Sequence, residues 1–149
     1  MSASVCRIIP SQPDFVPSAS ARERATAYLW TVLPFAEDVA CKVTPDVRFV
    51  DCGENFESVR CPRCGADLGE WWAIAMEAGH EQCFADLRVT TPCCGVKTTL
   101  NQLDYASPSG FARFVLEALE PGAGSLSHGS VERLRGLLGC DVRVIWAHY

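Results

Sequence analysis

The chain has 149 residues, of which 48% are hydrophobic and 21% are charged, and its formal net charge is −5. This length is sufficient for one domain with its own core, and the composition excludes a disordered chain. No apolar run approaches the roughly 20 residues that a membrane-spanning helix needs, and the N-terminal residues lack the apolar stretch of a secretory signal. We therefore expect a cytoplasmic protein that does not enter a membrane.

The first half of the chain predicts a strand, a helix and two further strands. Residues 5–9 are apolar and β-branched, and Pro10 ends this first strand. Ser20 and Glu23 have the spacing of a capping box, and apolar residues then recur at helical intervals, which predicts a helix over residues 20–33. Residues 47–51 and 56–60 alternate like strands, and residues 52–55 between them have the composition of a hairpin turn.

The second half predicts three helices and two strands. Residues 69–83 are rich in Ala and Glu and predict a helix, and residues 84–91 alternate like a strand. Ser107-Pro108 and the apolar residues after it predict a helix that ends at Pro121-Gly122. A short helix over residues 131–138, closed by Gly139, and a strand over residues 142–149 complete the chain.

This order of elements predicts a compact α+β fold. We expect one domain over residues 1–149, with a metal-binding element embedded in it at about residues 52–100.

Nine cysteines in a chain without a secretory signal indicate metal ligands or free thiols rather than disulfides. The sequence Cys61-Pro-Arg-Cys64-Gly has the spacing of a zinc knuckle, in which two thiolates reach one ion from a single tight turn. Three other cysteines stand singly among apolar residues, as buried thiols do: Cys6, Cys41 and Cys140.

A second, altered knuckle follows at residues 91–95, which read TPCCG. When the two knuckles are aligned on proline and glycine, Cys94 takes the second ligand position and Thr91 replaces the first cysteine. Cys93 is the natural substitute for the missing ligand, but His80 and Cys83, an H-x-x-C pair just upstream, are alternative donors. The predicted ligands of one structural Zn²⁺ are Cys61, Cys64, Cys93 and Cys94.

The two clusters resemble a zinc ribbon over residues 61 to about 100, and the chain is otherwise similar only to small bacterial proteins in general. Four thiolates leave no open coordination position, so the site is expected to be structural rather than catalytic. A zinc deaminase pattern is absent, because Glu81 directly follows His80 and Val96 stands where a second cysteine is needed.

The basic residues are scattered along the chain, and 13 of them stand against 18 acidic residues. Strong nucleic-acid binding needs a clustered basic face and is therefore not expected. An arginine-lined face in the folded protein would favour the opposite conclusion.

Three functions compete. We expect a non-enzymatic zinc-binding protein that contacts a macromolecule, such as an immunity, antitoxin-type or regulatory protein with a basic protein partner near Glu70 and Trp71. The first alternative is an enzyme with a polar pocket around His80, Asp104 and His148. The second is a nucleic-acid-associated regulator that uses the ribbon. The sequence leaves the oligomeric state open.

Overall fold

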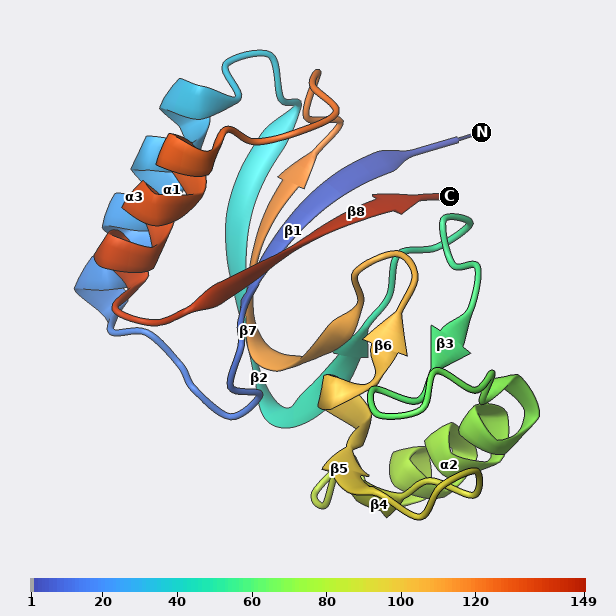
Figure 1. The fold of residues 1–149 in the computed structure, drawn as a ribbon. Coiled ribbons are helices and arrows are strands. Elements are labelled where there is room, and N and C mark those ends of the chain that lie inside the picture. The colour runs from blue at the N-terminus through green and yellow to red at the C-terminus, as the bar shows by residue number, and fades with distance from the viewer. Residues whose placement is uncertain (1) are drawn as a thin grey trace.

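Four antiparallel strands form the main sheet, in the order β2-β7-β1-β8 (Figure 1). The computed structural model describes residues 2–149. The strands of this sheet are β1 (Ser4–Pro10), β2 (Asp38–Val50), β7 (Gly110–Leu119) and β8 (Val142–His148). Helices α1 (Ala19–Val32) and α3 (His128–Leu138) lie side by side on one face of the sheet.

The connectivity consists of two interleaved βαβ units. In the first, β1-α1-β2, strand β7 lies between the two strands, and in the second, β7-α3-β8, strand β1 lies between them. This is the split βαβ arrangement of a ferredoxin-like topology. It leaves β2 and β8 as the two edges of the sheet. The structure thus confirms the predicted compact α+β class.

The main core lies between the two helices and the sheet. Helix α1 buries Ala21, Ala25 and Leu29 at four-residue intervals, which places all three on one face of the helix. Ala25 and Leu29 pack with buried side chains of the strands and of α3, including Ile8, Phe114, Leu116, Leu134 and Leu138. The helix begins one residue earlier than predicted, because Ser18 rather than Ser20 accepts the capping hydrogen bond from the Ala21 N–H.

The predicted helix after Pro108 is wrong, because this segment is strand β7. The alternate residues Ala112, Phe114, Leu116 and Ala118 are buried, as in a strand. Strand β7 is also central in the sheet, and apolar residues such as Val115 point to its other face. Because both faces of the strand carry apolar residues, their spacing in the sequence resembles that of a helix. Long-range pairing with β1 and β2 decides the conformation.

The predicted hairpin around residues 52–55 is also wrong. Strand β2 is much longer than residues 47–51, and β3 (Val59–Arg60) pairs with β6 (Asp104–Tyr105) instead of β2. Residues 52–55 lie against the edge of β8, where the Glu54 N–H donates to the carbonyl oxygen of His148 at 2.7 Å.

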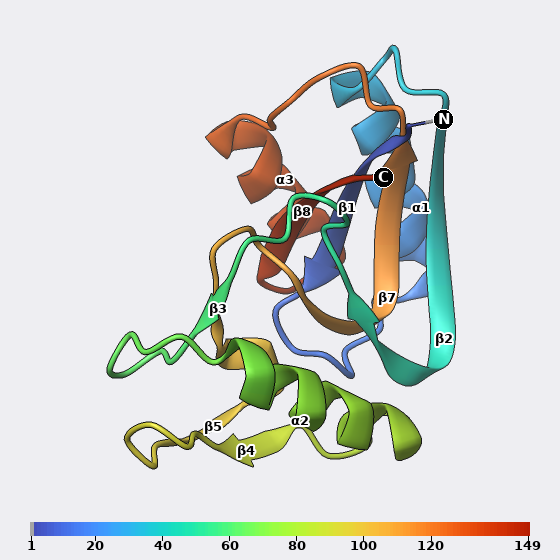
Figure 2. The same cartoon turned by 90° about the vertical axis from the view of Figure 1, so that its right-hand side faces the viewer.

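The connection from β2 to β7 forms a second lobe, which we call the cysteine lobe (residues 51–109). Figure 2 shows it below the main sheet. Besides β3 and β6 it contains α2 (Gly69–Glu81), β4 (Arg88–Thr90), β5 (Lys97–Thr99) and the 3-10 turn η1 (Leu100–Gln102). Strand β4 covers only part of the predicted strand 84–91, since Phe84 has a positive φ of 52°.

A second core joins the cysteine lobe to the sheet. Leu68, Leu100 and Tyr105 of the lobe pack with Phe111 of β7, which is fully buried. Across residues 2–149, no helix is both long and apolar enough to cross a membrane.

Candidate metal centre

The first knuckle is a tight turn at residues 61–66. The Cys61 N–H donates to the carbonyl oxygen of Ala66 at 2.9 Å, and the Gly65 N–H donates to the carbonyl oxygen of Cys61 at 3.0 Å. Gly65 has φ of 77°, a conformation that glycine adopts without steric cost. This turn directs the Cys61 and Cys64 thiols toward one point.

The second knuckle repeats this turn at residues 91–96, between β4 and β5. The Thr91 N–H donates to the carbonyl oxygen of Val96 at 3.0 Å, the Gly95 N–H donates to the carbonyl oxygen of Thr91 at 3.1 Å, and Gly95 has φ of 71°. Thr91 therefore occupies the position that corresponds to Cys61, as the alignment on proline and glycine predicts.

The structure brings together the four cysteines predicted as ligands. The Sγ atoms of Cys61, Cys64, Cys93 and Cys94 all lie within 4.8 Å of one another. The Cys61 and Cys94 sulfurs are 3.6 Å apart, and the Cys64 and Cys93 sulfurs are 3.4 Å apart. A tetrahedral ion with Zn–S bonds of about 2.3 Å separates its sulfurs by about 3.8 Å, close to these distances. The cluster could therefore hold one metal ion with little movement.

The backbone around Cys61 favours its thiolate. The N–H groups of Cys64 and Arg63, together with the Cys93 and Cys94 thiols, lower the pKa of the Cys61 thiol to about 6, and the Arg63 N–H lies 3.4 Å from the Cys61 sulfur. Metal-bound cysteine is deprotonated, so these N–H groups prepare Cys61 as a ligand. Cys61 is also the one buried member of the cluster, while the other three are exposed.

Thr91 is part of the site, although from the sequence it is only the residue that replaces the first cysteine of the second knuckle. Its side chain is 2% exposed, and its hydroxyl lies 3.9 Å from the Cys61 sulfur and 3.7 Å from the Cys94 sulfur. It therefore packs against one cysteine of the cluster from each knuckle.

Four convergent thiols from two matching turns could hold one metal ion. No protein-family model, curated protein or solved structure matches this chain. What the site binds is therefore inferred from its own residues.

The two alternative donors lie elsewhere. His80 and Cys83 line a groove of about 690 Å³ between α2 and β2, together with Asp46 and Glu77. Neither belongs to the cysteine cluster found among the described residues. The structure thus places Cys93, rather than His80 or Cys83, beside Cys61, Cys64 and Cys94.

The proposed polar pocket does not form. His80 is on α2, Asp104 pairs with Arg60 between β6 and β3, and His148 is on β8, where its Nδ1 lies 3.2 Å from the Ser4 hydroxyl. Within residues 2–149, no hydrogen bond or ion pair joins any two of these three residues.

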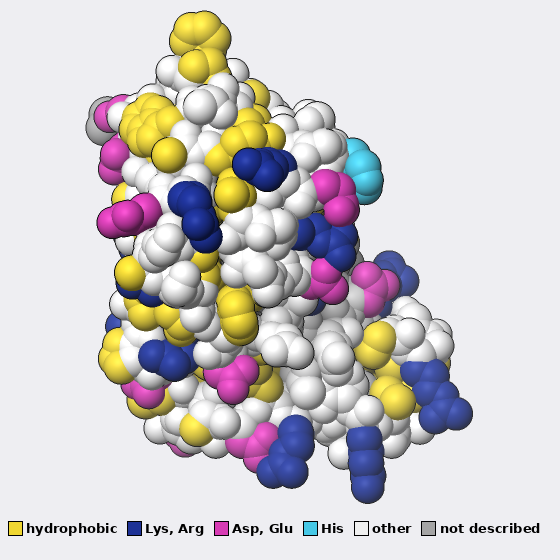
Figure 3. Space-filling view, turned by 90° about the vertical axis from the view of Figure 1, so that its left-hand side faces the viewer, with side chains coloured by type: hydrophobic (Ala, Val, Ile, Leu, Met, Phe, Trp, Pro, Cys, Tyr) yellow, Lys and Arg dark blue, Asp and Glu magenta, His cyan; other side chains and the backbone are white. Residues whose placement is uncertain are grey.

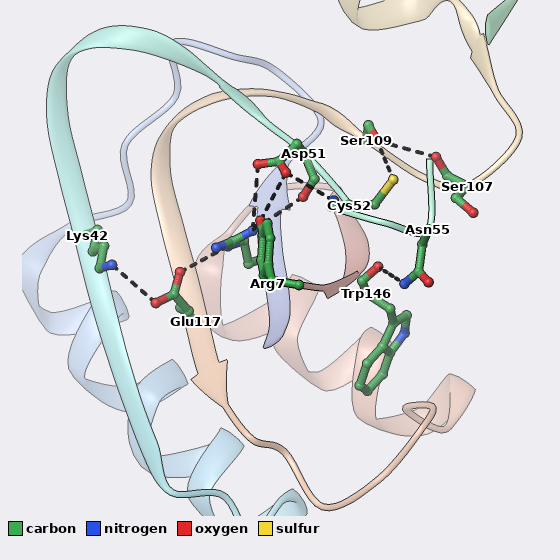
Figure 4. A network of polar contacts seen from close by, with 11 residues as sticks. Arg7, Lys42, Asp51, Cys52, Asn55, Ser107, Ser109, Glu117 and Trp146 are labelled. Carbon is green, nitrogen blue, oxygen red and sulfur yellow. Dashed lines mark hydrogen bonds and ion pairs between the residues drawn. The ribbon is translucent and has the colours of Figure 1, made fainter. Parts of the chain in front are cut away.

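A small hollow on the open face of the sheet gathers four of the basic residues. It has a volume of about 190 Å³, and its basic lining residues are Arg7, Lys42, Arg48 and Arg113. Glu117 lies between Arg7 Nε at 3.0 Å and Lys42 Nζ at 3.2 Å (Figure 4). Part of the positive charge is thus neutralised, and Arg48 has no ion-pair partner in the described part of the chain.

The fourth ligand can be tested by substitution. We expect Cys93→Ala to lower zinc affinity by more than the 10- to 100-fold that is typical when a hydrogen-bond partner of a ligand is removed, whereas Cys83→Ala and His80→Ala leave it unchanged. Thr91→Cys in the Cys93→Ala background should restore binding, because it recreates the regular knuckle. Competition with a chromogenic chelator measures all four affinities. A large loss in Cys83→Ala or His80→Ala, with none in Cys93→Ala, would reassign the ligand.

Proposed function

We propose that Cys61, Cys64, Cys93 and Cys94 hold one Zn²⁺ in a closed structural site, and that the protein acts by contact with another macromolecule. The observation that carries the metal assignment is the convergence of four Sγ atoms within 4.8 Å from two matching turns. Zn²⁺ prefers four tetrahedral thiolates of this kind, and such a site leaves no position for water or substrate. The two turns then constitute a zinc-ribbon-like element.

The ion would stabilise a lobe whose own secondary structure is slight. Its two sheets have two strands each, and strands β3 and β6 are only two residues long. Isolated two-stranded sheets are marginal in water. An ion that joins the turn at residues 61–66 to the turn at residues 91–96 would close the lobe around α2.

The side chains on the outer face of α2 favour a basic protein partner. Glu70, Ile74, Glu77 and Glu81 are exposed and follow one another at helical intervals, and Ile74 is 68% exposed. None of these three carboxylates forms an ion pair anywhere in residues 2–149. An apolar side chain framed by unpaired carboxylates is complementary to a basic protein surface. Immunity, antitoxin-type and regulatory proteins that mask a basic partner fit this chemistry.

The two tryptophans of α2 contribute to packing. Trp72 stacks on Phe56 with ring centroids 5.1 Å apart, and its indole N–H donates to the Tyr105 hydroxyl at 3.1 Å. Trp71 is half-buried against the same core. We therefore place the contact surface on the Glu70 and Ile74 side of the helix rather than on the tryptophans.

Charge reversal on α2 tests the partner. Zinc-loaded protein carrying Glu77→Arg is expected to lose, by about tenfold or more, the binding of a basic partner that the unaltered protein captures from host lysate. Glu57→Arg is the matched control, because Glu57 is exposed in the same lobe but outside α2. Equal loss in both variants, or none in either, would contradict the α2 surface and leave the zinc assignment intact.

The hollow lined by Arg7, Lys42, Arg48 and Arg113 favours a second candidate, a nucleic-acid-associated regulator. Its net charge is modest, so any binding should be salt-sensitive and indifferent to sequence. Nanomolar binding to DNA or RNA at physiological salt that is lost in Arg48→Ala would indicate that the partner is a nucleic acid rather than a protein.

A further inference from the structure

We propose that the free edge of β2 pairs with β2 of a second copy, so that the main sheets of two chains join across a two-fold axis. This inference concerns the edge of the main sheet and is independent of the metal.

The first half of strand β2 presents a regular edge. It lies at the end of the sheet and pairs only with β7, and Figure 2 shows no further strand on its outer side. Residues 38–43 pair without interruption, and the register shifts only between Val43 and Arg48. This regular stretch contains no proline and no bulge, two of the devices that block an edge from pairing; an edge lysine is a third, and Lys42 is the one such residue in the stretch.

The sequence of this edge is complementary to itself. In an antiparallel pair centred on Ala40, Asp38 of each copy lies opposite Lys42 of the other. Both are exposed and, two strand periods apart, point to the same face of the sheet. Opposite charges at directly opposed positions stabilise a strand pair. Lys42 keeps its own contact with Glu117, at 3.2 Å, on that face.

Helix α1 offers a matching surface beside the same edge. A shallow hollow of about 500 Å³ runs along it, and the small side chains of Thr26 and Ala27, together with Trp30 and Cys41, are among its lining residues. The Thr26 hydroxyl is 3.1 Å from the Cys41 sulfur, so the middle of α1 lies next to the centre of the edge. A two-fold axis at Ala40 therefore brings the two α1 helices together across this hollow.

Exposed apolar side chains accompany the edge. Trp30 is 37% exposed and Val43 is 44% exposed. Figure 3, which views the molecule from the helix side, shows hydrophobic side chains among the charged ones on this face. Pairing of the two edges would cover Trp30 with α1 of the second copy.

Sedimentation equilibrium with reversed charges tests this interface. The unaltered protein is expected to have twice the 16.3 kDa mass of one chain. Asp38→Lys and Lys42→Asp, each alone, should raise the dimer dissociation constant about tenfold or more, because two symmetry-related attractive pairs become repulsive. Glu57→Lys, a charge change at an exposed residue of the cysteine lobe outside β2, should leave the dimer intact.

Two combinations should restore the dimer. The double variant Asp38→Lys/Lys42→Asp recreates opposite charges within one chain, and an equimolar mixture of the two single variants recreates them between chains. Far-UV circular dichroism checks that each variant is folded. The unaltered protein is measured at about 100 μM, a concentration at which a dimer with a micromolar dissociation constant is almost fully formed. A monomer at this concentration would overturn the proposal. So would a dimer that the single variants leave unchanged, or a double variant and a mixture that both stay monomeric.

Discussion

Cys64→Ser should remove the metal and unfold the cysteine lobe. Cys64 is one of the four convergent thiols, and the ligands of a structural zinc come together only in the folded state, so binding and folding are coupled. We expect zinc content to fall from one ion per chain to nearly none. The melting temperature should fall by about 10 °C or more, the size of shift that a loss of several kcal/mol produces in a chain of this length.

Cys83→Ser is the matched control, because Cys83 is exposed in the same lobe but lies outside the cluster. It should keep both zinc and melting temperature. Native mass spectrometry and scanning calorimetry make the two measurements. If Cys64→Ser keeps one zinc per chain, Cys64 is not a required ligand. If it loses the zinc with no change in melting temperature, the metal does not stabilise the lobe.

Phe111→Ala should be among the most destabilising single substitutions in the protein. Phe111 is fully buried where the cysteine lobe meets the sheet, and its ring centroid lies 5.2 Å from those of both Phe49 and Phe84. Truncation of a buried phenylalanine leaves a cavity and typically costs about 3–5 kcal/mol. Urea unfolding of the zinc-loaded protein measures the change in free energy.

Phe35→Ala makes the same chemical change at a side chain that is 84% exposed. It should change the free energy of unfolding by less than about 0.5 kcal/mol. Similar values for the two variants would mean that Phe111 does not join the lobe to the sheet as the structure indicates.

Much of the fold could be predicted from local features of the sequence. Helices α1, α2 and α3 and strands β1 and β8 were predictable, because each is marked by its own periodicity or by a capping residue such as Gly139, which has φ of 74°. The left-handed conformation at this position is the one that glycine adopts most easily.

The non-local features were not predictable. Strand β7 is apolar on both faces because it is central in the sheet, and its sequence alone does not distinguish this from helical spacing. The pairing of β3 with β6 joins segments far apart in the chain, so no turn sequence between them indicates it. The split βαβ order depends on the same kind of long-range pairing.

The candidate site was more predictable than the fold, because metal ligands have characteristic spacing. The C-x-x-C pair fixes one half, and the proline and glycine of TPCCG give the register of the other. The close contact of Thr91 with the Cys61 and Cys94 sulfurs could not be predicted, since it depends on how the two turns meet in space.

X-ray absorption at the zinc edge tests the central proposal most directly, with protein purified from zinc-sufficient medium. If Cys61, Cys64, Cys93 and Cys94 are the ligands, the spectrum will show four sulfur neighbours at about 2.3 Å. A nitrogen or oxygen neighbour in place of a sulfur, or a folded protein without bound zinc, would contradict a closed four-thiolate site.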